Sequence, residues 1–240
     1  ENAGVSFGSA GTLRNQVAMA TPGATITFDP SVTNILLTTG QITIDKSLTL
    51  TGNGATTING NANGRIFDVT AGNFNLNNLM LTNGLADNGG AIQVTGANLT
   101  LNNSIVSNSI ANGPSGSGGA IMLNSNTSLM AMLSTFTGNR ANRAGGAIEV
   151  TAGTTTTLTN VTLTNNNAGV APATAAPGNG GALHVTGNGT VNITGGMVNM
   201  NMAASEGGGL WNGTGIMTVD GTTINGNTAA GIASDNGGVH

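Results

Sequence analysis

The residues best suited to chemistry in this chain occupy equivalent positions of a sequence repeat. Gly-Gly followed by a short apolar pair recurs, and the position four residues after the first glycine reads Gln93, Met122, Glu149, His184 and Trp211. If successive repeats stack, Glu149, His184 and Trp211 form one row that aligns an acid, a base and a ring able to stack on a sugar. This row is the candidate ligand site of the sequence, and a carbohydrate is the ligand it would suit.

Catalysis by this row would need more acidic groups than the sequence supplies. Glycoside hydrolysis uses two positioned carboxylates, and a lyase needs a base with a calcium site built from several acidic residues. The chain has nine acidic residues, and they are widely spaced. The mixed residue types in the row favour a solvent-facing strand with one incidental ion pair. We therefore expect a protein that is not an enzyme and has no catalytic, cofactor or metal site.

Two further groups of charged residues are weaker candidates. Arg140 and Arg143 flank one predicted corner and would either bind an anionic glycan or keep a loop soluble. Asp87 and Asp235 each lie just before a Gly-Gly pair, where one carboxylate per corner makes a poor Ca²⁺ site. With two histidines in the chain, no nucleophile–histidine–acid set is predicted.

Composition excludes several classes of partner. Only 6% of the 240 residues are charged and the net charge is −4, which argues against nucleic-acid binding. No apolar run approaches the length of a membrane span. The chain contains no cysteine, so disulfides and thiolate metal sites are excluded. Low charge, abundant Asn, Thr and Gly, and a first residue other than Met predict a secreted or cell-surface protein.

The N-terminal segment differs from the rest of the chain. Leu13, Val17 and Ala20 fall on one face of a helix that Thr12 could cap and Pro22-Gly23 would end. We expect this helix to cover the first rung of a solenoid, the capping role that repeat arrays require. Residues 1–22 then form an N-terminal segment with its capping helix, and residues 23–240 form the repeat body, regular from about residue 72.

The regular body alternates apolar and polar residues with period two and repeats in a fixed frame. The first glycines of successive pairs lie 29, 27, 35, 27 and 30 residues apart. A second apolar anchor recurs at Leu81, Val106, Phe136, Leu163, Val198 and Ile224, and from Val106 onward it follows the first glycine of a pair by 17 or 18 residues. Three residues after the anchor, Asn139, Asn166, Asn201 and Asn227 suit an internal amide ladder. Length variation is confined to one corner, before each Gly-Gly pair. The pattern predicts an all-β, right-handed parallel β-helix with a short N-terminal capping helix.

Two stretches resemble known families. Gly-Gly-Ala-Ile and Phe136-Thr137-Gly138-Asn139 resemble the GGA[ILV] and FxxN repeats of polymorphic outer-membrane protein passengers. Residues 11–17 and 22–30 resemble the start of secreted bacterial right-handed β-helix proteins with a CSLREA-type N-terminus, although here Asn15-Gln16 replace the usual Glu-Ala and the cysteine is missing. The resemblance implies a β-helix at the bacterial surface or outside the cell, and it implies no activity.

The expected function is a non-enzymatic extracellular structural protein that stacks head to tail into a fibre or surface layer. Self-association is expected at the ends, because terminal rungs expose unpaired backbone groups and apolar core. The candidate assembly residues are Val5, Phe7, Leu13, Val17, Ile232 and Val239. The alternatives are a fragment of a larger adhesin or autotransporter-like passenger, and a carbohydrate-binding or polysaccharide-degrading β-helix. Ice binding needs outward Thr in register. The column before the anchor is interrupted by Met80, Ile105 and Met197, and the column after it by Ser107, Asn199 and Asn225.

Overall fold

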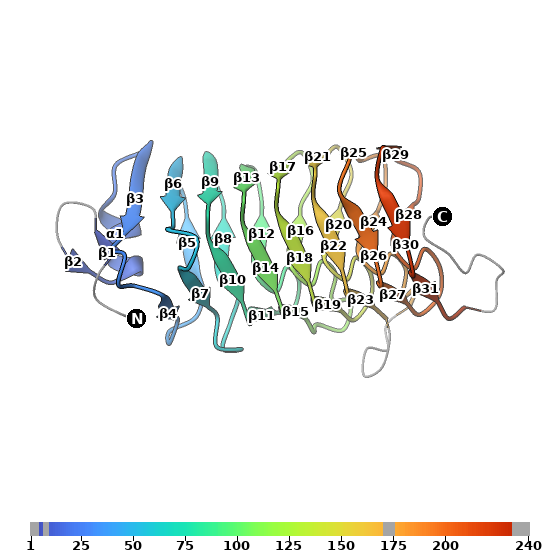
Figure 1. Cartoon of the computed structure of the whole chain (residues 1–240), viewed down its shortest axis with the longest axis horizontal. Helices are drawn as coiled ribbons and strands as arrows, with labels where there is room; N and C mark the ends of the chain where they lie inside the picture. Colours follow the sequence, from blue (N-terminus) through green and yellow to red (C-terminus); the bar gives the residue numbers. More distant parts are fainter. Residues whose placement is uncertain (1–4, 7–9, 170–175, 232–240) are drawn as a thin grey trace.

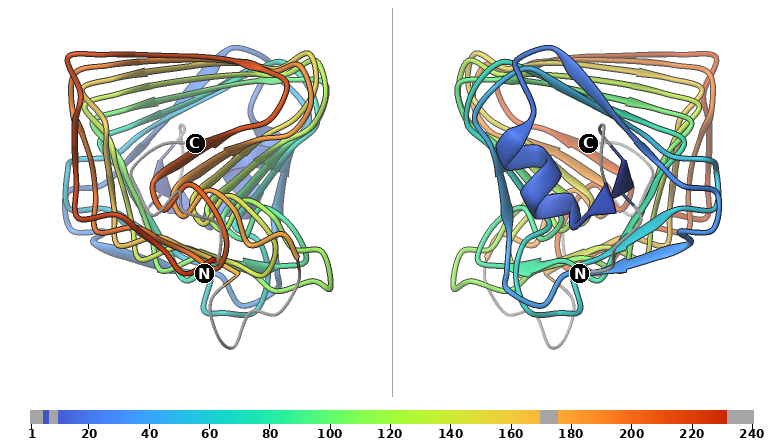
Figure 2. Two further views of the ribbon diagram at one scale, coloured as in Figure 1. Left: turned by 90° about the vertical axis from the view of Figure 1, so that its right-hand side faces the viewer. Right: turned by 90° about the vertical axis from the view of Figure 1, so that its left-hand side faces the viewer.

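The computed structural model describes residues 5–6, 10–169 and 176–231, which form a parallel β-helix (Figure 1). The first two turns pass through sheets A, B and C, and each full turn from residue 73 onward passes through four sheets in the order A, B, D, C before it begins again one strand further along the axis. The end-on views show the turns superposed on one another (Figure 2). The prediction of an all-β parallel β-helix with one short N-terminal helix is confirmed.

The four sheets are defined by their strands. Sheet A contains, in spatial order, β2 (Ala10–Gly11), β1 (Val5–Ser6), β3 (Ala24–Phe28), β6 (Leu48–Thr51), β9 (Asn73–Asn77), β13 (Asn98–Asn102), β17 (Ser128–Met132), β21 (Thr155–Thr159), β25 (Thr190–Thr194) and β29 (Ile216–Asp220). Sheet B contains β4 (Asn34–Leu36), β7 (Thr57–Asn59), β10 (Met80–Thr82), β14 (Ile105–Ser107), β18 (Thr135–Thr137), β22 (Thr162–Thr164), β26 (Met197–Asn199) and β30 (Thr223–Asn225). Sheet D contains β11 (Leu85–Ala86), β15 (Ile110–Ala111), β19 (Arg140–Ala141), β23 (Asn167–Ala168), β27 (Met202–Ala203) and β31 (Thr228–Ala229). Sheet C contains β5 (Ile42–Ile44), β8 (Phe67–Val69), β12 (Ile92–Val94), β16 (Ile121–Leu123), β20 (Ile148–Val150), β24 (Leu183–Val185) and β28 (Leu210–Asn212).

Parallel pairing between turns keeps equivalent residues in register. Leu101, for example, pairs with Leu76 on one side and Ala131 on the other. The apolar anchors stack in the same way along sheet B, as Phe136 does between Val106 and Leu163. Inward side chains therefore form continuous aliphatic columns that are almost completely buried. These columns replace the aromatic-rich core of an ordinary domain.

The Gly-Gly pair forms the corner between sheets D and C, and each glycine is required for its own reason. Gly145 has a φ of +59°, a conformation that side chains with a Cβ disfavour. A Cβ added to Gly146 would collide with the carbonyl oxygen of Gly181, which lies directly above it in the next turn. The pair is thus a structural corner that lets consecutive turns approach to strand-pairing distance.

The N-terminal helix closes one end of the solenoid (Figure 2, right). Helix α1 (Leu13–Met19) begins after Thr12, whose hydroxyl accepts a hydrogen bond from the Asn15 amide at 3.2 Å. Leu13 and Val17 are 0% and 3% exposed. Arg14 donates to the carbonyl oxygens of Gly40 and Gln41 at 2.7 and 2.6 Å, so the helix also satisfies backbone groups of the first turn. The expected capping role is what the helix performs.

The candidate assembly residues divide by location. Leu13 and Val17 pack into the first turn of their own chain, so neither presents the exposed contact surface expected of an assembly end. At Val5 only the backbone is described, and it pairs antiparallel with Gly11 and Phe28. Phe7, Ile232 and Val239 lie outside the described residues.

The predicted asparagine ladder runs inside the solenoid between sheets B and D. The side-chain amide of Asn139 donates to Oδ1 of Asn166 at 3.0 Å, Asn166 donates to Asn201 at 3.0 Å, and Asn201 donates to Asn227 at 2.8 Å. Asn166 also donates to the carbonyl oxygen of Phe136 and accepts from the backbone amide of Asn139, each at 3.0 Å. The ladder therefore satisfies backbone groups that the turn leaves unpaired.

We predict that Asn166→Ala lowers the free energy of unfolding by about 3 kcal/mol, because it leaves several buried polar groups of Asn139, Asn201 and Phe136 without partners. Urea or thermal unfolding followed by circular dichroism measures the change. Asn98→Ala is the matched control, since Asn98 joins a side-chain ladder on the exposed surface and its loss should cost about 0.5 kcal/mol or less. Equal effects of the two substitutions would contradict a structural role for the internal ladder.

Candidate functional site

The row identified in the sequence stands on the outer face of sheet C. Register along the sheet places Glu149 between Met122 and His184, and His184 between Glu149 and Trp211. The same column continues toward the N-terminal end through Gln93, Asp68 and Thr43. The structure thus brings together the three residues that the sequence placed in one row.

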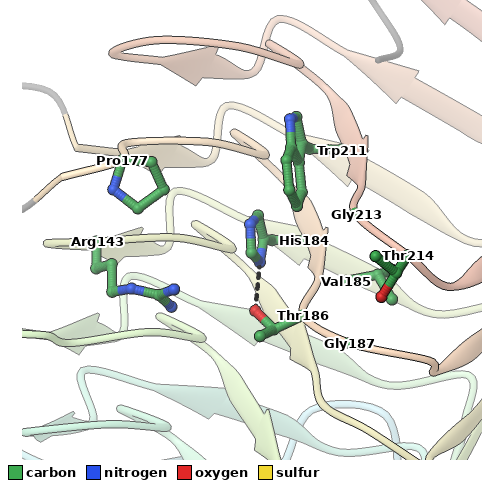
Figure 3. A pocket seen from close by; sticks show the side chains of 9 residues that line it. All are labelled: Arg143, Pro177, His184, Val185, Thr186, Gly187, Trp211, Gly213 and Thr214. Carbon is green, nitrogen blue, oxygen red and sulfur yellow. Dashed lines mark hydrogen bonds between the residues drawn. The ribbon is translucent and has the colours of Figure 1, made fainter.

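Two members of this row are buried, although both point away from the core columns. Glu149 is 1% exposed and His184 is 2% exposed. The expectation of a solvent-facing strand is therefore wrong at these two positions. His184 is covered on one side by Trp211, and the corner segment that contains Pro177 lines the same pocket (Figure 3). A buried carboxylate on the outside of a solenoid has to be paired, and this one is.

Glu149 is paired through one nitrogen of His184 and one hydroxyl. Nδ1 of His184 lies 3.1 Å from Oε1 and 3.0 Å from Oε2 of Glu149, and the contact to Oε1 has hydrogen-bond geometry. The hydroxyl of Thr186 donates to the same Oε1 at 2.6 Å and lies 3.1 Å from Nδ1. Nε2 of His184 is buried without a hydrogen-bond partner among the described residues.

This arrangement differs from a catalytic triad. In a triad the hydroxyl and the carboxylate bind opposite nitrogens of the imidazole, so that a proton can pass through the ring. Here Thr186 and Glu149 both contact Nδ1. The cluster is built to hold the imidazole and the carboxylate in place.

Trp211 is the only tryptophan of the chain, and its contacts include a ring stack and a hydrogen bond. Its ring stacks on His184 with centroids 4.4 Å apart and planes 5° from parallel. Its indole N–H donates to Oε2 of Glu206 at 2.9 Å. Glu206 in turn is joined to Asn179 of the preceding turn, which donates to the same oxygen at 3.4 Å. The tryptophan is therefore held in one orientation.

Arg143 reaches this cluster from the corner between sheets D and C. Its Nη1 donates to the Ser117 hydroxyl at 3.2 Å and lies 3.9 Å from Oε1 of Glu149. Arg140 lies three residues earlier, in β19 of sheet D. The sequence predicted one role for both arginines, but only Arg143 is among the residues that line the site. Arg143, Thr186 and Pro177 could not be placed there from column position, since they come from corners whose path varies between turns.

A pocket of about 230 Å³ opens over these residues (Figure 3). Its lining consists of Arg143, Pro177, His184, Val185, Thr186, Gly187, Trp211, Gly213 and Thr214. Gly213 contributes through the absence of a side chain, because a Cβ there would lie 3.0 Å from the Trp211 ring. The volume lies below the usual range for drug-sized ligands and suits one small ring.

A second cluster of charged and polar residues lies at the N-terminal end of the same column, and its members bind one another. Arg65 donates to Gln41 at 2.7 Å, to Gln93 at 2.8 Å and to the carbonyl oxygens of Asn88 and Gly89. Burial lowers the pKa of Arg65, and the nearby carboxylates of Asp68 and Asp87 partly oppose that shift. This network ties three turns together.

Neither a metal centre nor a membrane helix is found in the described part of the chain. Across residues 5–6, 10–169 and 176–231, no group of three or more His, Cys, Asp or Glu side chains could hold a metal ion. Within the same ranges no helix is long and apolar enough to cross a membrane.

Comparison with models of protein families, with curated proteins and with solved structures finds no match to this chain.

We predict that His184→Ala lowers the free energy of unfolding by about 3 kcal/mol, because it removes the Nδ1 partner of a buried carboxylate and the ring under Trp211. His184→Phe should retain the stacking and still lose most of this stability. Thermal unfolding followed by the fluorescence of the single tryptophan measures both. Thr43→Ala, at an exposed position of the same column, should change stability by about 0.5 kcal/mol or less. A His184→Ala variant as stable as Thr43→Ala would show that the buried pair contributes nothing.

Proposed function

We propose that this protein is a non-enzymatic extracellular β-solenoid that binds a saccharide in the pocket beside Trp211. The observation that carries the proposal is the fixed orientation of Trp211 at the wall of a small pocket, with the guanidinium of Arg143 and the hydroxyl of Thr186 on the same lining. An aromatic face with a few polar groups around it matches a sugar ring, which has an apolar face and polar edges.

The buried groups support this reading as positioning residues. His184 positions the Trp211 ring by stacking on it. Glu149 positions His184 and Thr186 through its contacts with them, and its carboxylate attracts the guanidinium of Arg143. Pre-organised groups lower the entropy cost of binding, which matters for a small and strongly hydrated ligand. The guanidinium also gives the pocket one cationic group, suited to a carboxylated sugar.

The geometry favours binding over hydrolysis. Glycosidases place two carboxyl groups on either side of the bond that breaks, and both must reach the substrate. Glu149 is 1% exposed and is covered by its own partners. None of the described residues that line the pocket is acidic. An extracellular location is supported by the composition alone.

We predict that Trp211→Ala and Arg143→Ala each weaken saccharide binding by about tenfold or more, equivalent to about 1.4 kcal/mol. A panel of neutral and uronic-acid oligosaccharides, screened by the fluorescence of Trp211 and then titrated by calorimetry, measures the effect. Arg140→Ala is the matched control, because Arg140 lies in the same turn but outside the pocket. Absence of binding to every member of the panel would contradict the proposal, as would equal losses in Arg140→Ala and Arg143→Ala.

A second function is favoured by the C-terminal end of the described solenoid. We propose that its last turn joins a second copy of the chain. Val219 continues the inward column of Leu158 and Ile193, which are 0% and 2% exposed, yet Val219 itself is 36% exposed. Strands β28, β29, β30 and β31 are the terminal strands of their sheets among the described residues. Open parallel edges beside exposed core side chains are a template for further β-pairing.

The two ends of the solenoid are not equivalent in this respect. Helix α1 covers the first turn. Its Arg14 donates to the carbonyl oxygens of Gly40 and Gln41, and Lys46 donates back to the carbonyl oxygens of Ala18 and Ala20 at the end of the helix. A docked copy would therefore meet helix α1 or the short antiparallel edge of β2 rather than a matching stack of parallel strands. In the proposed head-to-tail fibre or surface layer, the C-terminal edge is the surface that binds the next copy.

We predict that Val219→Lys reduces self-association at the C-terminal edge, because it places a charge in the column that a partner would cover. Sedimentation and electron microscopy over a range of concentrations measure it. Leu133→Lys is the control, since Leu133 is 62% exposed on the side of the solenoid. A wild-type chain that stays monomeric at high concentration would contradict self-association through this edge.

A further inference from the structure

The widest surface of uniform composition is the outer face of sheet A, whose strands stand side by side along the upper row of Figure 1. From β9 onward each of its strands is five residues long and presents outward residues in three ranks. The middle rank is Thr25, Thr49, Asn75, Thr100, Met130, Thr157, Asn192 and Thr218. The second rank is Thr27, Thr51, Asn77, Asn102, Met132, Thr159, Thr194 and Asp220. The third rank is Asn73, Asn98, Ser128, Thr155, Thr190 and Ile216.

The composition of this face is unusual for a soluble protein. All but four of these positions carry Thr, Asn or Ser, and the exceptions are Met130, Met132, Ile216 and Asp220. Only Asp220 is charged, on the last described strand of the sheet, whereas an ordinary surface is about one quarter to one third charged. The three ranks contain no aromatic side chain.

These properties exclude several occupants. A face with a single carboxylate offers no charge complementarity to nucleic acid or to an acidic or basic protein. The lack of aromatic rings disfavours a polysaccharide surface, which would be held by stacking. The hydroxyl and amide groups disfavour a lipid or an apolar protein face. What remains is a ligand that is itself a regular array of hydrogen-bonding groups.

The spacing of the face along the solenoid axis is close to a spacing found in ordered water. Neighbouring parallel strands lie about 4.8 Å apart, and residues two apart on one strand lie about 6.6 Å apart. Water oxygens hydrogen-bonded at about 2.8 Å in a tetrahedral network have second neighbours about 4.6 Å apart, by geometry alone. The difference along the solenoid axis is about 0.2 Å per strand, so each rank can hold lattice water nearly in phase over a few neighbouring strands before the offset reaches about 0.8 Å after four strands.

The side chains of the face are restrained as such binding requires. Threonine is β-branched and has few rotamers, so its hydroxyl and methyl keep fixed positions on a strand. Asn98 donates to Asn73 at 2.9 Å, and the Ser128 hydroxyl donates to Asn98 at 2.7 Å, which links three consecutive strands of the third rank. Asn75 donates to the Thr49 hydroxyl at 3.2 Å in the middle rank.

We propose that the outer face of sheet A binds ice. The two columns that flank the apolar anchor, whose interruptions argue against ice binding, belong to sheet B. The strands of sheet B have three residues and offer only two outward ranks. Sheet A is a different face with longer strands. Its ranks are interrupted on two strands, by Met130 and Met132 on β17 and by Ile216 and Asp220 on the terminal strand β29. This function is independent of the saccharide pocket on sheet C.

The test measures thermal hysteresis and inhibition of ice recrystallisation with the purified chain. The wild-type protein should open a hysteresis gap and shape ice crystals into facets. Thr100→Lys combined with Thr157→Lys, both in the middle rank, should abolish the gap, because a long charged side chain holds the lattice off the face. Thr135→Lys combined with Thr162→Lys on sheet B should leave it unchanged, since these outward threonines lie on another face.

A gain of function makes the test sharper. Met130→Thr combined with Met132→Thr completes two ranks across β17 and should widen the gap relative to wild type. Circular dichroism and thermal unfolding confirm that each variant is folded. A folded wild-type chain without effect on ice growth overturns the proposal. It is also overturned if the sheet A and sheet B variants lose activity equally, or if the folded chain binds crystalline cellulose or chitin while leaving ice unaffected.

Discussion

The constraint on which this structure depends is the fixed separation of consecutive turns, about 4.8 Å, set by parallel backbone hydrogen bonds. Consecutive turns must follow nearly the same path at that distance, so a corner residue cannot carry a side chain that projects into the backbone of the next turn. The second glycine of each corner pair meets this requirement, as Gly146 does under the carbonyl of Gly181. The same separation brings Asn139, Asn166 and Asn201 within hydrogen-bonding distance of one another.

The constraint also explains how a uniform scaffold carries distinct sites. Outward residues of one column are neighbours whatever their type, so a change in a few positions creates a local cluster without altering the fold. On sheet C this places Glu149 against His184 and His184 against Trp211. On sheet A it arranges threonine and asparagine in ranks that repeat with the backbone.

The fold followed from the sequence because its determinants repeat. Apolar columns, glycine pairs and Asn166 with its equivalents recur in one frame, and the helix at Leu13 and Val17 had a clear period. The burial of Glu149 did not follow, since it depends on what covers the outer face rather than on register. Thr186 and Arg143 approach from corners, and corner paths depend on local turn geometry that a column alignment does not contain. Two of the residues expected at the assembly ends, Phe7 and Ile232, lie outside the described part of the chain.

The closed N-terminal end gives the solenoid a direction of growth. Strand partners lie one turn earlier in the chain, as in Asn98 with Asn73 and Thr190 with Thr155. A chain that folds from helix α1 onward can add later turns one at a time onto the completed edge of the preceding turn. Each addition closes a loop of similar length, so the entropy cost per turn stays constant as the molecule lengthens. Folding of this large β-structure becomes a sequence of short, templated steps.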